Sequence, residues 1–349
     1  MLWMIVLVLI GLIAFPERAA AAAAEGATSW WLHVVPALTP HLVLTGLLLK
    51  SAPAGGRCGP FHPVAVRALL LGAAGGYPAG ARVIGAEADL TDRQRRRFLL
   101  LSSLPNPAFL ISVVAVGLFG RSETALPLCG AVYGAALVLF LLLGRGGAAG
   151  NAKRPKRLSA ADVADAIGAA GEAIVRIGVC IVLCRVLLAL LEGAGAVRLL
   201  AAILPASEET LTALLSGFLE MSSGCALAAR LPVPFSLRLG LCAFFSMFGG
   251  LSILLQIRSF SNIPSLWRFL LERLLLAAAA GALCCGLCRL LPVAAAEAMA
   301  GPHAVLRRAG TLLELVISGG FGLLCGVYFA LLTRSAPKKR QPGDNARTV

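Results

Sequence analysis

Short polar or glycine-rich interruptions within apolar segments carry the residues whose types could bind a small solute. The four interruptions are Gly72–Gly80, Ser102–Pro107, Gly217–Gly224 and Ser246–Ser252. Each is expected to end one half-helix and to start another, and the start of a half-helix exposes free N–H groups and about half a positive charge. Such ends, pointed into a shared cavity, can bind a carboxylate or a phosphate without a fully buried cation.

Glu220 carries the strongest chemical signal, because a carboxylate in the middle of an apolar segment is costly and seldom accidental. It can pair with an arginine, bind a coupling Na⁺ or proton, or be protonated. Ser222 and Ser223 follow it closely. They can donate hydrogen bonds to a substrate or cap the next half-helix, and both roles stay open.

The other interruptions complete the predicted site. Asn106 precedes Pro107, a good pair for a cap and a first helical turn. The predicted substrate-binding residues are Tyr77, Pro78, Gly80, Arg82, Ser103, Asn106, Glu220, Ser222, Ser223, Gly250, Ser252 and Gln256. A structural role is an open alternative for many of them, such as a capped kink at Asn106 or a snorkelling side chain at Arg82.

Motifs for catalysis are missing from the sequence. No Gly-Lys-Ser/Thr follows the glycine-rich stretch, and there is no HExxH metal motif. The cluster of Cys284, Cys285 and Cys288 has no second pair at ligand spacing, so packing is favoured over metal binding. We therefore expect neither an enzyme nor a bound cofactor, and any transport would be passive or driven by a gradient of Na⁺ or protons.

Composition defines the class of protein. The chain has 349 residues, of which 58% are hydrophobic and 14% charged, with a mean hydropathy of +0.86. Soluble proteins carry about 45–50% apolar and about 25% charged residues, so the numbers exclude a soluble enzyme and a disordered chain. The net charge of +14 does not indicate nucleic-acid binding, because the basic residues lie between apolar runs, as in cytoplasmic loops of membrane proteins.

The pattern predicts an all-α polytopic membrane protein with about eight transmembrane helices and two re-entrant helical hairpins. The expected spans are 1–15, 30–49, 97–118, 124–144, 163–191, 237–257, 269–291 and 311–333, and the hairpins are 64–88 and 210–230. We favour a retained first span over a cleaved signal, and Trp30 with Trp31 as an interfacial anchor. With both termini in the cytoplasm, most Lys and Arg residues fall on the cytoplasmic side, as expected.

The interruptions recur along the chain in a way that predicts an inverted repeat, the plan of many secondary transporters. Gly80 and Gly224 follow the two hairpin tips 144 residues apart, and Pro107 and Gly250 are 143 apart. The expected domains are N-terminal helices (1–60), a first gate-like repeat (61–145), a basic cytoplasmic linker (146–162), a connecting helix and outer loop (163–209), a second gate-like repeat (210–292), a C-terminal helix (293–334) and a polar tail (335–349).

Several ordered motifs resemble one known family. They are Pro36–Pro40, Gly76–Arg82, Leu104–Ile111, Val116–Gly120, Gly217–Gly224 and Phe248–Ile253. Together they resemble the sporulation integral membrane protein family called YlbJ or SpoVV over roughly residues 1–335. The sequence departs from the family in detail, since Ser103 and Leu104 lie where paired asparagines are more common.

The resemblance implies a membrane protein with nucleoside-recognition or gate domains, related to concentrative nucleoside transporters. It further implies movement of dipicolinic acid across the outer forespore membrane, derived from the mother cell, during sporulation. The expected partners are this small anion and the lipid bilayer, with an oligomer left open. The alternatives are a non-transporting scaffold for spore-envelope (cortex) formation and a nucleoside-type solute carrier.

Overall fold

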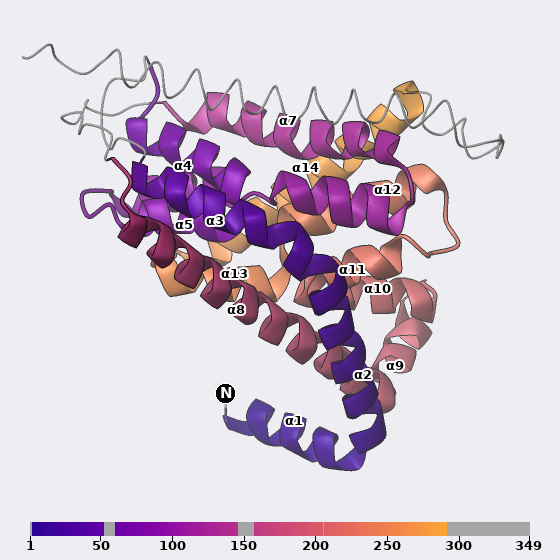
Figure 1. Cartoon of the computed structure of the whole chain (residues 1–349). Helices are drawn as coiled ribbons and strands as arrows, with labels where there is room; N and C mark the ends of the chain where they lie inside the picture. The colour runs from indigo at the N-terminus through magenta and orange to yellow at the C-terminus, as the bar shows by residue number, and fades with distance from the viewer. Residues whose placement is uncertain (1, 52–59, 146–156, 205, 292–349) are drawn as a thin grey trace, which may run out of the picture.

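The computed structural model describes residues 2–51, 60–145, 157–204 and 206–291, and within these ranges it contains helices and no strand (Figure 1). The predicted span 311–333, the tail from 335 and most of the linker 146–162 lie outside the described residues. The helices are α1 Leu2–Ala14, α2 Pro16–Ser29, the π-helix η1 Trp30–Val34, α3 Val35–Ser51, α4 Pro63–Gly75, α5 Tyr77–Gly85, α6 Asp92–Ser102, the π-helix η2 Phe109–Leu118, the 3₁₀-helix η3 Ser122–Thr124, α7 Ala125–Leu143, α8 Ala160–Gly193, α9 Ala196–Ile203, α10 Glu208–Leu219, α11 Met221–Ala228, α12 Phe235–Phe248, α13 Gly250–Phe260 and α14 Leu266–Leu290.

The chain is a multi-pass membrane protein. Four stretches of the described residues are long and apolar enough to cross a bilayer: Ser122–Leu143, Ala160–Gly193, Phe235–Phe260 and Leu266–Leu290. The number rises to six if each of two bent helix pairs counts as one span, so the predicted count of eight is not confirmed. Large apolar side chains remain exposed on these helices, among them Leu142 of α7 and Leu275 of α14, as expected of surfaces that face lipid.

The N-terminal helices differ from the predicted pair of separate spans. The segment between those spans is helical, because its run of alanines is strongly helix-forming. Helix α1 bends by 103° into α2, and α2, η1 and α3 then continue without a gap from Pro16 to Ser51. Trp30 is not a simple interfacial anchor, because its indole Nε1 donates to the carbonyl of Ile174 at 3.1 Å.

The chain breaks in each of the four predicted places. Helices α4 and α5 meet at Gly76, which has a φ of +79°, and α12 and α13 meet at Gly249, with a φ of +82°. Glycine tolerates this left-handed region without steric cost. Residues 103–106 separate α6 from the segment that leads into η2, and Glu220 separates α10 from α11.

Both predicted hairpins are present as pairs of packed short helices. A Cβ on Gly72 of α4 or Gly80 of α5 would lie 2.1 or 2.4 Å from the carbonyl oxygen of Ser102, so both helices close on this backbone. In the second hairpin a Cβ on Gly224 would lie 2.2 Å from the Cα of Gly217. Their re-entrant position in a membrane stays a prediction.

The same order of elements occurs twice. Paired elements begin at residues 16 and 160 (α2 and α8), 63 and 208 (α4 and α10), 77 and 221 (α5 and α11), 92 and 235 (α6 and α12), 109 and 250 (η2 and α13), and 125 and 266 (α7 and α14). We call residues 16–143 the first half and 160–290 the second half. This recurrence is wider than the predicted units, since it includes α2–α3 and α8.

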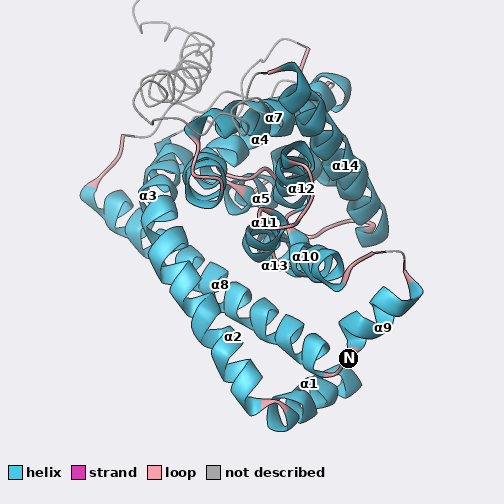
Figure 2. Cartoon of the chain, turned by 90° about the vertical axis from the view of Figure 1, so that its right-hand side faces the viewer, coloured by secondary structure: helices cyan, strands magenta, loops and turns pink. Residues whose placement is uncertain are grey.

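Equivalent helices of the two halves run in opposite directions. Gly26 near the end of α2 lies against Val182 late in α8, whereas Gly46 in α3 lies against Ala166 early in α8. Contacts whose positions rise on one helix and fall on the other define an antiparallel pair. Figure 2 shows α2 and α8 side by side along one edge of the molecule.

Two hydrogen bonds join residues to their own equivalents. Trp30 bonds to Ile174, and the Tyr77 hydroxyl donates to the sulfur of Met221 at 3.4 Å, each across 144 positions. Two equivalent groups can touch only near the axis that relates the two copies, as in a symmetric dimer. The pseudo-twofold axis therefore passes close to both contacts.

One buried arginine links the breaks of both halves. Arg273 of α14 is 3% exposed. Its Nε donates to the carbonyl of Phe248 at 3.0 Å, its Nη2 to that of Met247 at 2.8 Å, and its Nη1 to that of Ser103 at 3.3 Å. The first two acceptors are orphan carbonyls at the end of α12, where a cation is also favoured by the helix dipole.

Replacing Gly80 by alanine should destabilise the protein. The new Cβ would meet backbone 2.4 Å away, and such overpacking costs about 1–3 kcal/mol. Gly168→Ala on α8 is the control, because no neighbouring atom lies within 4 Å of its Cβ position. Thermal unfolding in detergent should show a lower melting temperature for Gly80→Ala alone. Equal melting of the two variants would refute the close approach.

Removing the guanidinium of Arg273 should destabilise the protein more strongly. In Arg273→Met each carbonyl left unpaired costs about 1–3 kcal/mol. Arg273→Lys should recover only part of the lost stability, because an ammonium lacks the planar array of N–H donors of the guanidinium. Arg268→Met on the same helix is the matched control, because Arg268 is exposed. Melting temperatures and size-exclusion profiles test this ranking of the variants by stability. If Arg273→Met melts at the same temperature as Arg268→Met, the guanidinium does not stabilise the breaks.

Candidate functional site

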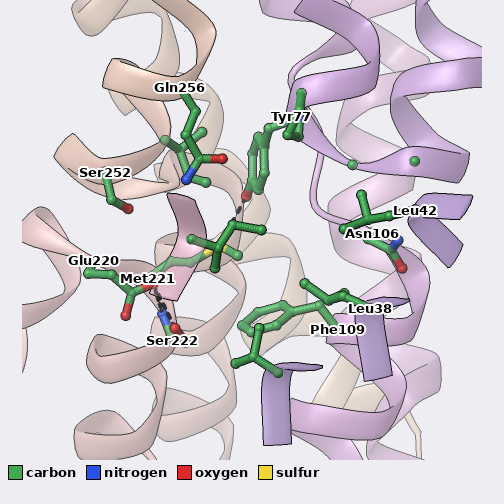
Figure 3. A pocket seen from close by; sticks show the side chains of 16 residues that line it. Leu38, Leu42, Tyr77, Asn106, Phe109, Glu220, Met221, Ser222, Ser252 and Gln256 are labelled. Carbon is green, nitrogen blue, oxygen red and sulfur yellow. Dashed lines mark hydrogen bonds between the residues drawn. The ribbon is translucent and has the colours of Figure 1, made fainter. Parts of the chain in front are cut away.

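A cavity lies where the four breaks come together. Its volume is about 50 Å³, enough for a few water molecules at about 10–15 Å³ of water-centre space each. Its polar lining residues are Tyr77, Asn106, Glu220, Ser222, Ser252 and Gln256, and Pro78 also lines it. In Figure 3 the labelled side chains of the first half face those of the second half across this space.

Glu220 caps helix α11. It is 4% exposed, and its Oε1 accepts from the backbone N–H of Ser222 at 2.9 Å and from the Ser222 hydroxyl at 2.6 Å. Its Oε2 accepts from the N–H of Ser223 at 2.8 Å. A carboxylate suits this position, because it satisfies orphan N–H groups at the positive end of the helix.

This cap changes the expectation for the two hairpin tips. The N-terminus of α11 was a candidate for a carboxylate of the substrate, and the protein's own carboxylate occupies it. In the described structure α5, after Gly76, and α13, after Gly249, have no side-chain cap. The half-helix starts without a side-chain cap at these breaks are therefore those of α5 and α13.

Asn106 performs the capping role that the Asn-Pro pair indicated. Its Oδ1 accepts from the N–H of Ala108 at 2.6 Å, and its Nδ2 donates to the carbonyl of Ala74 at 3.4 Å. The side chain thus starts the helical segment that leads into η2 and ties it to the end of α4. Because it also lines the cavity, a structural role and contact with a solute are compatible.

Tyr77 sits on the pseudo-twofold axis. It is 3% exposed, and its hydroxyl donates to the carbonyl of Ser246 as well as to Met221. The guanidinium carbon of Arg273 lies 5.6 Å from the centre of its ring. One face of the cavity therefore has an aromatic ring with a buried cation beside it.

Ser252 and Gln256 are polar side chains without a hydrogen-bond partner in the described part of the chain. They are 3% and 8% exposed, and they lie one turn apart on α13, where both line the cavity. Within the described residues neither side chain has a hydrogen bond to the protein. Buried polar groups are normally satisfied, so water or a bound solute in the cavity is the expected partner.

Other predicted residues lie outside the cavity lining. Arg82 stacks on Phe260, with its guanidinium carbon 4.5 Å from the ring centre. Ser223 lies behind Glu220 and accepts from Nε of Arg185 at 3.0 Å. Ser103 is fully enclosed and contributes its carbonyl to Arg273.

Gly80 and Gly250 act through close approach. Gly80 packs on Ser102, and a Cβ on Gly250 would lie 2.9 Å from the carbonyl oxygen of Leu219. Side chains at these positions would push the hairpins away from the broken helices. The structure thus gives both glycines a positioning role next to the cavity.

Arg273 and Arg185 are the residues that sequence reasoning missed. The available signal was a single arginine inside an apolar span, which is costly unless it is paired. The carbonyl partners of Arg273 are those of Met247 and Phe248, about 25 positions away, and of Ser103, 170 positions away, so spacing could not identify them.

Comparison with known proteins supports the resemblance only in part. No family model and no solved structure matches the chain. The chain is 28% identical over 134 residues to the "Sporulation integral membrane protein YlbJ" of Bacillus subtilis (strain 168). The match covers 35% of this chain and 33% of the relative, so the chain spans about a third of the length of the protein it matches. Similarity of this extent supports a relation to that protein without establishing membership of its family.

Proposed function

We propose that the protein is a carrier that moves a small polar solute through the cavity at the breaks by alternating access. The observation that supports this proposal most strongly is the pair of antiparallel halves whose axis runs through the cavity wall at Tyr77 and Met221. Inverted repeats with a site between broken helices are the plan of many secondary transporters. Rocking one half against the other would expose such a site to each side in turn.

Dipicolinate is the first solute to test. Its two carboxylates suit the two uncapped helix starts, at α5 and α13, and its ring can lie against Tyr77. The hydroxyl of Ser252 and the amide of Gln256 can donate to the same oxygens. A cavity of about 50 Å³ is too small for this solute, so binding requires the halves to separate. The relation to a sporulation protein supports a role in sporulating cells, and the outer forespore membrane is the location that we propose for it.

The charge of Glu220 gives a reason for a coupling ion. Of the described residues that line the cavity, Glu220 is the one acidic or basic side chain. A dianion that enters would face this carboxylate at low effective dielectric, where like charges repel strongly. A proton or Na⁺ bound with the solute would remove part of this repulsion.

A neutral solute is the second candidate. The lining apart from Glu220 consists of amides, hydroxyls and apolar groups, which suits a nucleoside-like molecule as well as an anion. A protein that carries neither solute would instead fit the scaffold alternative.

The test is uptake into proteoliposomes that contain the purified chain. We expect saturable uptake of labelled dipicolinate that depends on a Na⁺ or pH gradient. In Ser252→Ala with Gln256→Leu the loss of two hydrogen bonds of about 1 kcal/mol each should reduce uptake about 30-fold. Glu220→Gln keeps an acceptor for the α11 cap and should abolish the gradient dependence.

The matched control is Leu255→Ala, which changes an exposed side chain on the same helix. The Ser252→Ala with Gln256→Leu variant and the control should melt like the parent, because Ser252 and Gln256 make no hydrogen bonds with the rest of the described chain. Glu220→Gln should melt lower, because an amide has one acceptor oxygen for the two capped N–H groups of α11. Uptake of uridine in place of dipicolinate would favour the second candidate. No uptake of either solute by folded protein under any gradient would reject the carrier proposal.

A further inference from the structure

Two further cavities occupy equivalent places in the two halves. One, of about 350 Å³, lies between α2, α8 and the second hairpin, and the other, of about 20 Å³, lies between α3, α8 and the first hairpin. Their walls contain equivalent residues: Ala22 and Glu25 line the large one, and Ala166 and Ala169, each 144 positions later, line the small one. Ala189 of the large cavity and Thr45 of the small one are likewise 144 positions apart. The two cavities are therefore equivalent parts of the two halves.

The small cavity is closed by direct helix contacts. Its lining includes Ala166, Ala169, Ala170 and Ala173 of α8. A Cβ on Gly46 of α3 would lie 3.4 Å from that of Ala166. Such small side chains let helices approach closely in a membrane protein.

An aromatic cluster joins the three elements at this closed end. Phe260 of α13 lies under Arg82 of α5, at 4.5 Å, and near Arg176 of α8, at 5.7 Å from the ring centre. Arg176 also donates to Ser259 at 3.4 Å and pairs with Glu172 at 2.5 Å. Each cation–π contact is worth about 0.5–1 kcal/mol at an exposed site and more when it is desolvated. The cluster therefore links both halves where the small cavity would open.

Hydrogen bonds connect residues that line the large cavity with residues that line the central one. Arg185, which lines the large cavity, donates to Ser223 at 3.0 Å and contacts Glu25 at 3.4 Å. The N–H of Ser223 donates in turn to Glu220, which lines the central cavity. A chain of hydrogen bonds across the first turn of α11 therefore links the wall of the large cavity to the wall of the central one.

We propose that the two equivalent cavities are the alternating entrances to the central cavity, and that this structure is open at the entrance lined by Glu25 and Arg185. The cluster of Arg82, Phe260 and Arg176 is the latch that holds the other entrance shut. In the opposite conformer the latch separates and the space around Ala22 closes. The proposal rests on the proposed carrier function and adds the route and the direction that this conformer faces.

Single cysteines at equivalent positions test the entrances. Ala22→Cys and Ala166→Cys are placed in the full chain and labelled with a small hydrophilic maleimide in detergent, where reagent reaches both ends. Labelling of the parent chain gives the background from its own cysteines. A closed state opens in about 10% of molecules or fewer, so Ala166→Cys should label at least about tenfold more slowly than Ala22→Cys.

Breaking the latch should shift both rates in opposite directions. Phe260→Ala should speed the labelling of Ala166→Cys and slow that of Ala22→Cys. Arg176→Gln should act in the same sense if Phe260→Ala does not fold. Phe218→Ala is the matched control, because Phe218 is an exposed ring on α10 whose ring contacts are with Phe244 and Phe248 and not with the latch, and it should change neither rate.

The two readouts separate the two proposals. Equal labelling of Ala22→Cys and Ala166→Cys would overturn the proposal that these cavities are alternating entrances. The same holds if Phe260→Ala speeds the labelling of Ala166→Cys without slowing that of Ala22→Cys, because local loosening has no reciprocal effect. Reciprocal changes in labelling without uptake of dipicolinate would support the proposed entrances and reject dipicolinate as the solute. Uptake without reciprocal changes in labelling would support the carrier function and reject this route into the central cavity.

Discussion

A helix that breaks inside an apolar environment frees backbone groups that must find partners, and this constraint governs the centre of the protein. The freed carbonyls at the end of α12 and in the break after α6 accept from Arg273. The freed N–H groups of α11 donate to Glu220, and that of Ala108 donates to Asn106. Three side chains thus make four interruptions tolerable in one place.

The candidate site consists of what these partners leave unsatisfied. The starts of α5 and α13 have glycines in place of side-chain caps, and the side chains of Ser252 and Gln256 face open volume. Groups that stabilise the fold and groups free for a solute are therefore interleaved around one small space. This arrangement explains why Tyr77, Asn106, Glu220 and Ser222 each have a structural partner as well as a position in the wall.

The sequence was informative about the breaks and less so about their partners. Glycine and proline at 76–78, 105–107 and 249–250 mark interruptions by local chemistry alone. The extent of the repeat was missed at α2 and α8, because an alanine-rich segment and a longer apolar span share no motif. The direction of Arg82 was equally unpredictable, since a long side chain can reach lipid headgroups, a cavity or an aromatic ring from the same backbone position. The π-turns of η1 and η2 left no signal that spacing could detect.

The two halves carry their capping side chains at non-equivalent breaks, and this has a consequence for how the protein could have arisen. Gly76 corresponds to Glu220, and Asn106 corresponds to Gly250, each 144 positions apart. Two copies of either half alone would bring together two glycine tips or two carboxylates, and neither pair reproduces the mixed lining seen here. The two tips could therefore acquire their different residues only after the coding sequence of one half had been duplicated, because both subunits of a homodimer carry the same residue at each position.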